Sequence, residues 1–315
     1  MVYSNSNQST QKPDFSNNCN DEVSCLICHR FAKEEDDSAF AIFPCNVRAF
    51  REEKFQVWRC HQCGTIHCLD QVDLNQYYGQ YPYADATLNL PFRLFYQKLC
   101  QELTQWGFSK KSLILDYGCG NGLLIQYLKE KGFINAYGYD PYGASHSFGN
   151  ADVLEYAPFN YIILQDVIEH LDDPNPTLEQ LDSLLAPGGY IFIGTPNAKR
   201  LDLTQPELSD YYNPIHVPYH RHIYTPETLI ELVRPWGWEA CHFFDRPYSD
   251  TRWFSLNTRS WNQYQRLLDG TLNAVFEPIK ISTALKSPRF WWYALFGYWQ
   301  SFHTEMAILF RKIDQ

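Results

Sequence analysis

The sequence predicts an α/β fold in which a mostly parallel sheet is covered by helices on both faces. Short apolar strands alternate with helical segments from Ser112 onward, and a glycine-rich loop separates the first of these strands from the first helix. A cluster of cysteines before residue 70 marks a separate small module. The 315 residues suffice for one large domain or two unequal ones with a sizeable core.

The charge and the apolar runs of the chain exclude some function classes. With 26 Lys and Arg against 36 Asp and Glu, the formal charge is -10, which argues against a general nucleic-acid binder but leaves room for a local basic pocket. The first residues lack the features of a secretory signal. The longest apolar stretch, Phe290 to Trp299, is shorter than the roughly 20 residues that span a bilayer. We therefore expect a soluble, cytoplasmic protein with reduced cysteines.

The N-terminal third predicts a tail, a metal module and a connecting helix. Residues 1–22 are polar and aperiodic and predict a disordered tail, whereas residues 71–110 form a connecting segment with a helix over Leu90 to Trp106. Between them, residues 23–70 hold two C-x-x-C pairs, and such pairs supply the four thiolates that tetrahedral zinc prefers in a closed structural site. The predicted ligands are Cys25, Cys28, Cys60 and Cys63. Because His29, His61, His67, Cys45 and Cys68 lie nearby, the identity of the fourth ligand stays open.

The following elements alternate as a parallel sheet requires. We expect strands at 113–115, 136–139, 161–164 and 190–193, and helices at 123–131 and 178–185. A further helix opens at Thr225-Pro226-Glu227, which places an N-cap, a proline at the first position and an acid in the first turn.

The loop Asp116-Tyr117-Gly118-Cys119-Gly120-Asn121-Gly122 is the sharpest local signal. Glycines allow the backbone to turn tightly and to approach a ligand near the helix N-terminus. Asp140 ends the next strand, where a carboxylate accepts both hydroxyls of a ribose. The dinucleotide pattern needs a glycine where Leu123 stands, and the acid that opens the loop suits a ligand with an ammonium group better than a pyrophosphate.

At these residues the chain resembles the class I S-adenosylmethionine-dependent methyltransferases, whose first motif is an acid followed by G-x-G-x-G. Tyr161 to His170 is similar to their fourth strand, and Leu184 to Asn197 to their fifth strand with its Pro-Gly-Gly lead-in. The resemblance implies a Rossmann-like, doubly wound, mostly parallel seven-stranded sheet over 111–248 plus 303–313. It also implies S-adenosylmethionine contacts from Asp116, Gly118, Cys119, Gly120, Asn121, Asp140, Asp152 and Gln165. The cysteine module resembles the zinc ribbon found ahead of many family members.

One departure from the family concerns the third strand. Its end is expected at Ala151-Asp152, but only about ten residues separate Asp140 from Ala151, so the usual second helix must be very short or absent.

Histidines dominate the expected catalytic residues. His170 follows the fourth strand, whereas His216, His220 and His222 lie in the loop after the fifth, and an imidazole is a competent base for a hydroxyl acceptor. Tyr219 to Tyr224 is similar to the Tyr-His-Glu-His segment of sugar C-methyltransferases, whose last histidine is the base; here Arg221 replaces the Glu. We expect the base among His222, His170 and His220, while helix capping or a hydrogen-bond network is the alternative for each. Glu169 either orients a donor or contacts the substrate.

Residues 249–302 form an aromatic, α-helical insertion before the last strand. The aromatics serve simple packing, a hydrophobic wall for the substrate, or docking on a membrane surface through 286–300, where Lys280, Lys286 and Arg289 lie nearby.

The sequence as a whole predicts a methyltransferase for a small-molecule, sugar or lipid-like acceptor, with O-methylation favoured. An RNA or protein methyltransferase guided by the ribbon, and a non-catalytic module that binds cofactor and a partner, are the alternatives.

Overall fold

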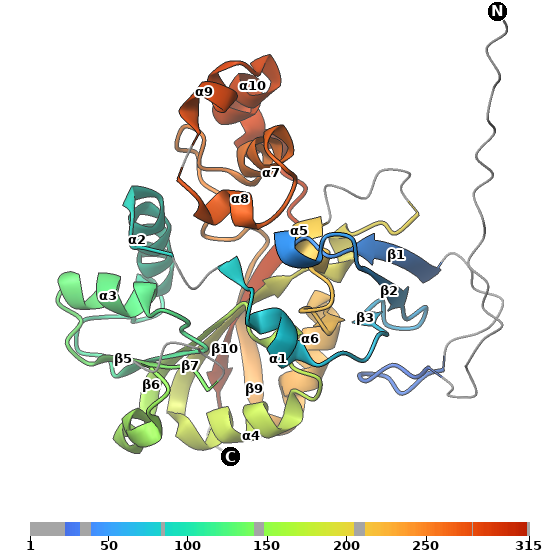
Figure 1. Cartoon of the computed structure of the whole chain (residues 1–315). Helices are drawn as coiled ribbons and strands as arrows, with labels where there is room; N and C mark the ends of the chain where they lie inside the picture. Colours follow the sequence, from blue (N-terminus) through green and yellow to red (C-terminus); the bar gives the residue numbers. More distant parts are fainter. Residues whose placement is uncertain are drawn as a thin grey trace, which may run out of the picture.

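The computed structural model describes residues 23–31, 39–82, 86–141, 148–204, 212–278 and 280–313 (Figure 1). The tail expected at 1–22 lies outside the described residues. A six-stranded mixed sheet forms the centre, in the order β5-β4-β6-β7-β10-β9. The strands are β4 (Ile114–Tyr117), β5 (Ala136–Tyr139), β6 (Phe159–Gln165), β7 (Leu185–Pro196), β9 (Trp238–Phe244) and β10 (Glu305–Lys312). The first four in the sheet are parallel, and β10 runs antiparallel to both of its neighbours.

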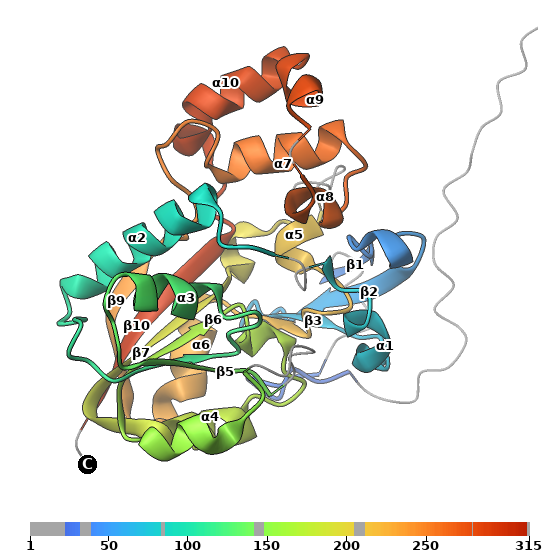
Figure 2. The same cartoon turned by 60° about the vertical axis from the view of Figure 1, so that its left-hand side comes forward.

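Two apolar clusters on opposite faces confirm the doubly wound arrangement. On one face, α2 (Leu90–Thr104) and α3 (Leu123–Glu130) pack Leu103 and Leu128 against Ile163. On the other face, α4 (Asn175–Leu184) and α6 (Pro226–Val233) pack Leu181 and Leu229 against the same sheet. The views in Figures 1 and 2 show both helical layers. The predicted start of α6 is confirmed, since Thr225 caps the helix through a capping box.

The expected count of seven strands is not what the described residues contain. Where the third strand was expected, Ala151–Tyr156 forms the 3-10 helix η4, and β5 is an edge strand. The physical reason is length, because a parallel crossover needs a dozen or more residues before the next strand can begin.

The cysteine module is a small sheet that shares a core with the loop after β7. Its strands are β1 (Phe40–Pro44), β2 (Lys54–Arg59), β3 (Ile66–Cys68) and β8 (His222–Ile223), all antiparallel. Because β8 comes from the loop after β7, a strand from outside residues 23–70 completes the sheet of this module. Phe43 and Ile66 of the ribbon pack with Ile215 and Tyr219 of that loop. The short helices α1 (Leu74–Tyr78) and α5 (Tyr212–Ile215) flank this core.

The insertion between β9 and β10 is helical, as predicted, and stands above the sheet in both views (Figures 1 and 2). It comprises α7 (Thr258–Leu267), α8 (Asn273–Phe276), α9 (Ile281–Leu285), α10 (Pro288–Phe296) and the 3-10 helix η9 (Gly297–Gln300). Tyr264, Phe290 and Ala294 form part of its own small core. We call residues 249–302 the cap. Within the described residues, no helix combines the length and apolarity needed to cross a membrane.

Candidate active site

The glycine loop lies between the end of β4 and the start of α3, as predicted. Gly118, Gly120 and Gly122 all have positive φ values, of 77°, 52° and 69°. A Cβ at Gly118 would overlap the side chain of Val167, and one at Gly122 would overlap the ring of Phe148. The loop therefore requires glycine for both conformation and space. The contact with Val167 also places the loop against the segment that follows β6.

Two buried carboxylates lie beside this loop. Asp116 and Asp140 are 6% and 8% exposed, and the backbone N–H of Gly120 donates to Asp140 Oδ2 at 2.7 Å. Burial raises the pKa of Asp116 to about 7, and the neighbouring Asp140 adds to the rise. Burial also raises the pKa of the Cys119 thiol, whose sulfur lies close to Gly138. Cys119 thus contributes its position in the loop, not a reactive thiolate.

The remaining predicted cofactor residues surround the same edge of the sheet. Asp152 is exposed on η4, and Asn150 holds it through bonds of 3.0 Å to its backbone N–H and its carboxylate. Gln165 ends β6 and lies across Gly194, where any Cβ would collide with it. Asn121 lies half-buried in the glycine loop itself.

An acidic cluster, Asp166, Glu169 and Glu305, lies where the ends of β6 and β7 meet the start of β10, and only Glu169 was singled out in the sequence. Asp166 has a left-handed φ of 52°, and the protein packed around it raises the pKa of its carboxyl to about 6 although the side chain stays accessible to solvent. Burial, Asp166 and Asp250 raise the pKa of Glu305 to about 8. Glu169 is fully buried, and neither carboxyl oxygen has a hydrogen-bond partner. Among the described residues, none of Asp166, Glu169 and Glu305 pairs with a Lys or Arg.

Three of the predicted histidines form one cluster beside Glu169. The rings of His170 and His220 lie 4.7 Å apart, and those of His216 and His220 lie 5.0 Å apart. His220 donates from Nδ1 to the carbonyl of Pro214 at 2.8 Å. Its other nitrogen, Nε2, therefore carries a lone pair in the neutral ring and lies 3.9 Å from Glu169 Oε1. Burial lowers the pKa of His220 to about 4 and that of His170 well below its usual range, so both rings are neutral at pH 7.

Tyrosines from the connecting segment complete the wall of the cluster. The Tyr78 hydroxyl lies 2.9 Å from His170 Nδ1, and the Tyr81 hydroxyl lies 3.1 Å from His216 Nε2. Asn46, which follows β1 of the ribbon, bonds His216 from the other side. His170 is the one histidine of the three whose side chain is not fully buried. The aromatic run after the ribbon was visible in the sequence, but its pairing with histidines more than 90 residues away was not.

His222, the third predicted base, is placed elsewhere. It lies on β8 and pairs through Nδ1 with His67 Nδ1 at 2.9 Å, while its Nε2 lies 3.0 Å from the carbonyl of Asp172. His67 in turn lies 3.3 Å from the Cys25 sulfur. His222 therefore joins the ribbon sheet to the loop after β6 and does not contact the other three histidines.

The four predicted metal ligands come together. The sulfurs of Cys25, Cys28, Cys60 and Cys63 lie within 4.8 Å of one another, and the closest pairs are 3.5 Å apart. A tetrahedral ion with metal–sulfur bonds of about 2.3 Å requires sulfurs roughly 3.8 Å apart, so the set fits such an ion. Glu169, His170 and His220 also offer ligand atoms within 4.8 Å of one another. A cavity of about 590 Å³ between α6 and β9 is lined by none of the predicted cofactor, catalytic or metal residues.

Comparison with known proteins finds a related family for the central part of the chain. A family model described as a methyltransferase domain matches residues 92–242. This part of the chain is similar to methyltransferase domains. Two curated relatives are ubiquinone biosynthesis O-methyltransferases, from Caulobacter vibrioides (31% identical over 106 residues) and Vibrio atlanticus (26% over 125 residues). These matches cover 27% and 34% of this chain, but only 40% and 51% of the relatives.

Solved structures of methyltransferases are also similar. A S-adenosylmethionine-dependent methyltransferase from Archaeoglobus fulgidus has a TM-score of 0.37 at 20% identity, and the match covers 69% of this chain and 94% of that chain. A 1,6-didemethyltoxoflavin-N1-methyltransferase from Burkholderia thailandensis has a TM-score of 0.41 at 13% identity, with 82% and 96% covered.

Proposed function

We propose that the protein is an S-adenosylmethionine-dependent methyltransferase that methylates a hydroxyl group of a small acceptor, with His170 as the general base. The observation that carries this proposal is the position of His170. It is neutral and partly accessible, and it follows the same β6 segment whose Val167 packs on the glycine loop. A base beside the methyl donor is what hydroxyl methylation requires of the protein.

The residues of the loop fit the proposed cofactor. Asp116 and Asp140 would hold its methionine part and ribose, and exposed Asp152 would face the adenine, with Gln165 alongside. S-adenosylmethionine, when bound, supplies an electrophilic methyl group on a cationic sulfonium. Burial raises the pKa values of Asp116 and Glu305, and a positively charged ligand beside either carboxyl would favour its ionised form.

His170 acts through its neighbours. The acceptor hydroxyl lies against His170 and gives its proton to the imidazole, while Tyr78 holds the ring through Nδ1. Glu169 offers a carboxyl oxygen within 4.8 Å of the His170 ring nitrogen and would face the imidazolium that forms. His220 is a positioning residue, because its own ring is buried and fixed by Pro214. The contacts of His222 with His67 and Asp172 favour a structural role for that residue.

The acidic cluster also bears on the class of acceptor. The exposed carboxylate of Asp166 would repel the phosphates of RNA, which favours a small acceptor over a nucleic acid. The printed activity of the curated relatives, O-methylation in ubiquinone biosynthesis, supports a hydroxyl acceptor.

We further propose that the four cysteines hold a structural zinc ion. Their four sulfurs leave no open coordination position, so the ion would stabilise the ribbon and take no part in methyl transfer. His67 would serve as an outer-shell partner through its contact with Cys25.

Two measurements test the proposal. Calorimetry should show binding of S-adenosylhomocysteine, and absence of heat with both this compound and S-adenosylmethionine would refute a cofactor site. Transfer of radiolabelled methyl from S-adenosylmethionine to a catechol probe should fall about 100-fold or more in His170→Asn, with unchanged S-adenosylhomocysteine affinity. His222→Asn is the matched control and should keep its activity; equal losses in both variants would remove His170 from the mechanism.

A further inference from the structure

We propose that the cap docks on the surface of an anionic phospholipid bilayer through the exposed face of α10 and the adjoining turn at Trp253-Phe254. This inference is independent of the proposed function, since it rests on the surface of the cap and not on the active site.

The outer face of α10 is a continuous apolar stripe. Trp292, Leu295 and Trp299 are 53%, 55% and 65% exposed, and with Phe296 they follow helical spacing on one side of the helix and its 3-10 extension. The opposite side, which carries Phe290, is buried in the cap. Helix α10 is therefore apolar on both faces, although only one is covered.

The turn before α7 extends this stripe. Trp253 and Phe254 are both more than half exposed, and the Phe254 ring lies 5.7 Å from that of Trp291. Four exposed tryptophans, Trp253, Trp291, Trp292 and Trp299, thus lie on the turn, α10 and its extension, and tryptophan prefers the boundary between headgroups and acyl chains.

The charge of the cap is opposite to that of the rest of the chain. Six basic and three acidic residues give the cap a formal charge of +3, which leaves -13 for the remainder of a chain of -10. The basic residues are Arg252, Arg259, Arg266, Lys280, Lys286 and Arg289, and the acidic residues are Asp250, Asp269 and Glu277. Of the three acids, Asp250 is buried against Arg246 and Asp269 pairs with Arg48 outside the cap, whereas Glu277 pairs with both Arg48 and Lys280.

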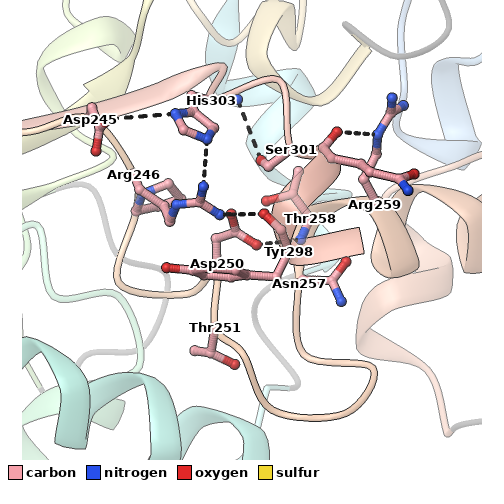
Figure 3. Close-up of polar contacts among 12 residues, drawn as sticks. Asp245, Arg246, Asp250, Thr251, Asn257, Thr258, Arg259, Tyr298, Ser301 and His303 are labelled. Carbon is pink, nitrogen blue, oxygen red and sulfur yellow. Dashed lines mark hydrogen bonds and ion pairs between the residues drawn. The ribbon is translucent and has the colours of Figure 1, made fainter. Parts of the chain in front are cut away.

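Polar contacts at the junction between β9 and the cap fix the orientation of the cap (Figure 3). Arg246 lies between β9 and the cap, where it donates to Asp250 Oδ2 and to the carbonyl of Tyr298, each at 2.7 Å, and to His303 at 2.6 Å. Its guanidinium also stacks on the Tyr298 ring, 3.9 Å from the centroid. Both ends of the insertion are thereby tied to one side chain, so the aromatic face is presented without ordering of a flexible segment.

Charge complementarity decides which occupant fits this face. A second copy would bring two cationic caps together, whereas an anionic bilayer attracts the rim and accepts the tryptophans. The rest of the chain has a formal charge of -13, so an anionic bilayer would repel its other surfaces. The surface therefore matches peripheral attachment with the cap facing the lipid.

Flotation of the full chain with vesicles tests this inference. We expect binding to vesicles of phosphatidylcholine with phosphatidylglycerol, weaker binding to phosphatidylcholine alone, and loss of binding at high salt. Each of Trp292→Ser and Trp299→Ser should lower the partition coefficient about tenfold, and the pair Lys286→Glu with Arg289→Glu at least about fivefold per residue.

Matched controls separate the cap from general effects. Ile134→Ser removes an equally exposed apolar side chain outside the cap, and Lys110→Glu with Lys111→Glu makes the same change of net charge. These controls should bind as the wild type does. Absence of wild-type binding to anionic vesicles, or equal losses in cap and control variants, would overturn the inference. A dimer in sedimentation velocity that Trp292→Ser abolishes would overturn it in favour of a second copy.

Discussion

Asp116 supplies the sharpest test of the cofactor site, because its titration and the binding of a cationic ligand must be coupled. The carboxyl is 6% exposed, and burial together with Asp140 raises its pKa to about 7. An ammonium group placed beside Asp116 favours the carboxylate and lowers this pKa. Binding therefore needs the deprotonated form, and the affinity for S-adenosylhomocysteine should rise as the pH rises.

The magnitude follows from the titration. With a pKa of about 7, roughly a tenth of Asp116 is ionised at pH 6 and roughly nine tenths at pH 8. The dissociation constant should therefore fall about tenfold over this range, which corresponds to about 1.4 kcal/mol. Calorimetry at constant ionic strength measures it directly.

Two variants show whether Asp116 is the titrating group. In Asp116→Asn the affinity should be lower, and the tenfold dependence on pH should disappear. Asp152→Asn changes an exposed carboxyl near the same site and should retain the pH dependence of the affinity. Titration of the ligand itself affects the wild type and both variants equally, so it does not alter the comparison. If Asp116→Asn kept the pH dependence of the wild type, the assignment of the cationic end of the ligand to Asp116 would be wrong.

Three further predictions concern the loop, the cap and the metal. Gly122→Ala should lower cofactor affinity more than about tenfold because of strain and the overlapping ring, whereas Gly270→Ala, which also has positive φ but open space around it, should leave calorimetric binding unchanged. Arg246→Met should lower the free energy of unfolding by about 3–5 kcal/mol because it leaves a buried carboxylate unpaired, while the exposed Arg234→Met should change it by less than about 0.5 kcal/mol in urea titrations. Cys28→Ser should reduce zinc below one ion per chain by elemental analysis and destabilise the fold by about 3 kcal/mol; a full zinc content would contradict the ribbon assignment.

Local patterns in the sequence predicted most of the fold. Three features depend only on residues close together in the sequence: the glycine loop, the alternation of strands and helices, and the N-terminal capping box of α6. Their physical causes can therefore be recognised in the sequence itself. The expectation of seven strands followed the family pattern, although the short distance between Asp140 and Ala151 argued against one of them. The short spacer after Asp140 leaves no room for a helix and a third strand, and a 3-10 helix forms there instead.

The site was less predictable because its contacts join distant segments. The histidines lie at the edge of the sheet where the sequence predicted them. However, His222 contacts His67 of the cysteine module whereas His220 lies beside Glu169, and this difference is visible only in the folded structure. The contacts of Tyr78 with His170 and of Asn46 with His216 span 92 and 170 residues, and no periodicity encodes either pair. The left-handed backbone of Asp166 likewise has no signature in the amino-acid type.

These long-range contacts change how the ribbon is to be understood. Asn46 lies between β1 and β2 and bonds His216 of the histidine cluster, and β8, which begins two residues after His220, completes the sheet of the cysteine module. A structural ion held by the four cysteines would therefore support one wall of the proposed active site at a distance, although it would touch no reacting atom. The cysteine module and the loop that carries His216 and His220 share one apolar core, so we expect the geometry of each to depend on the other.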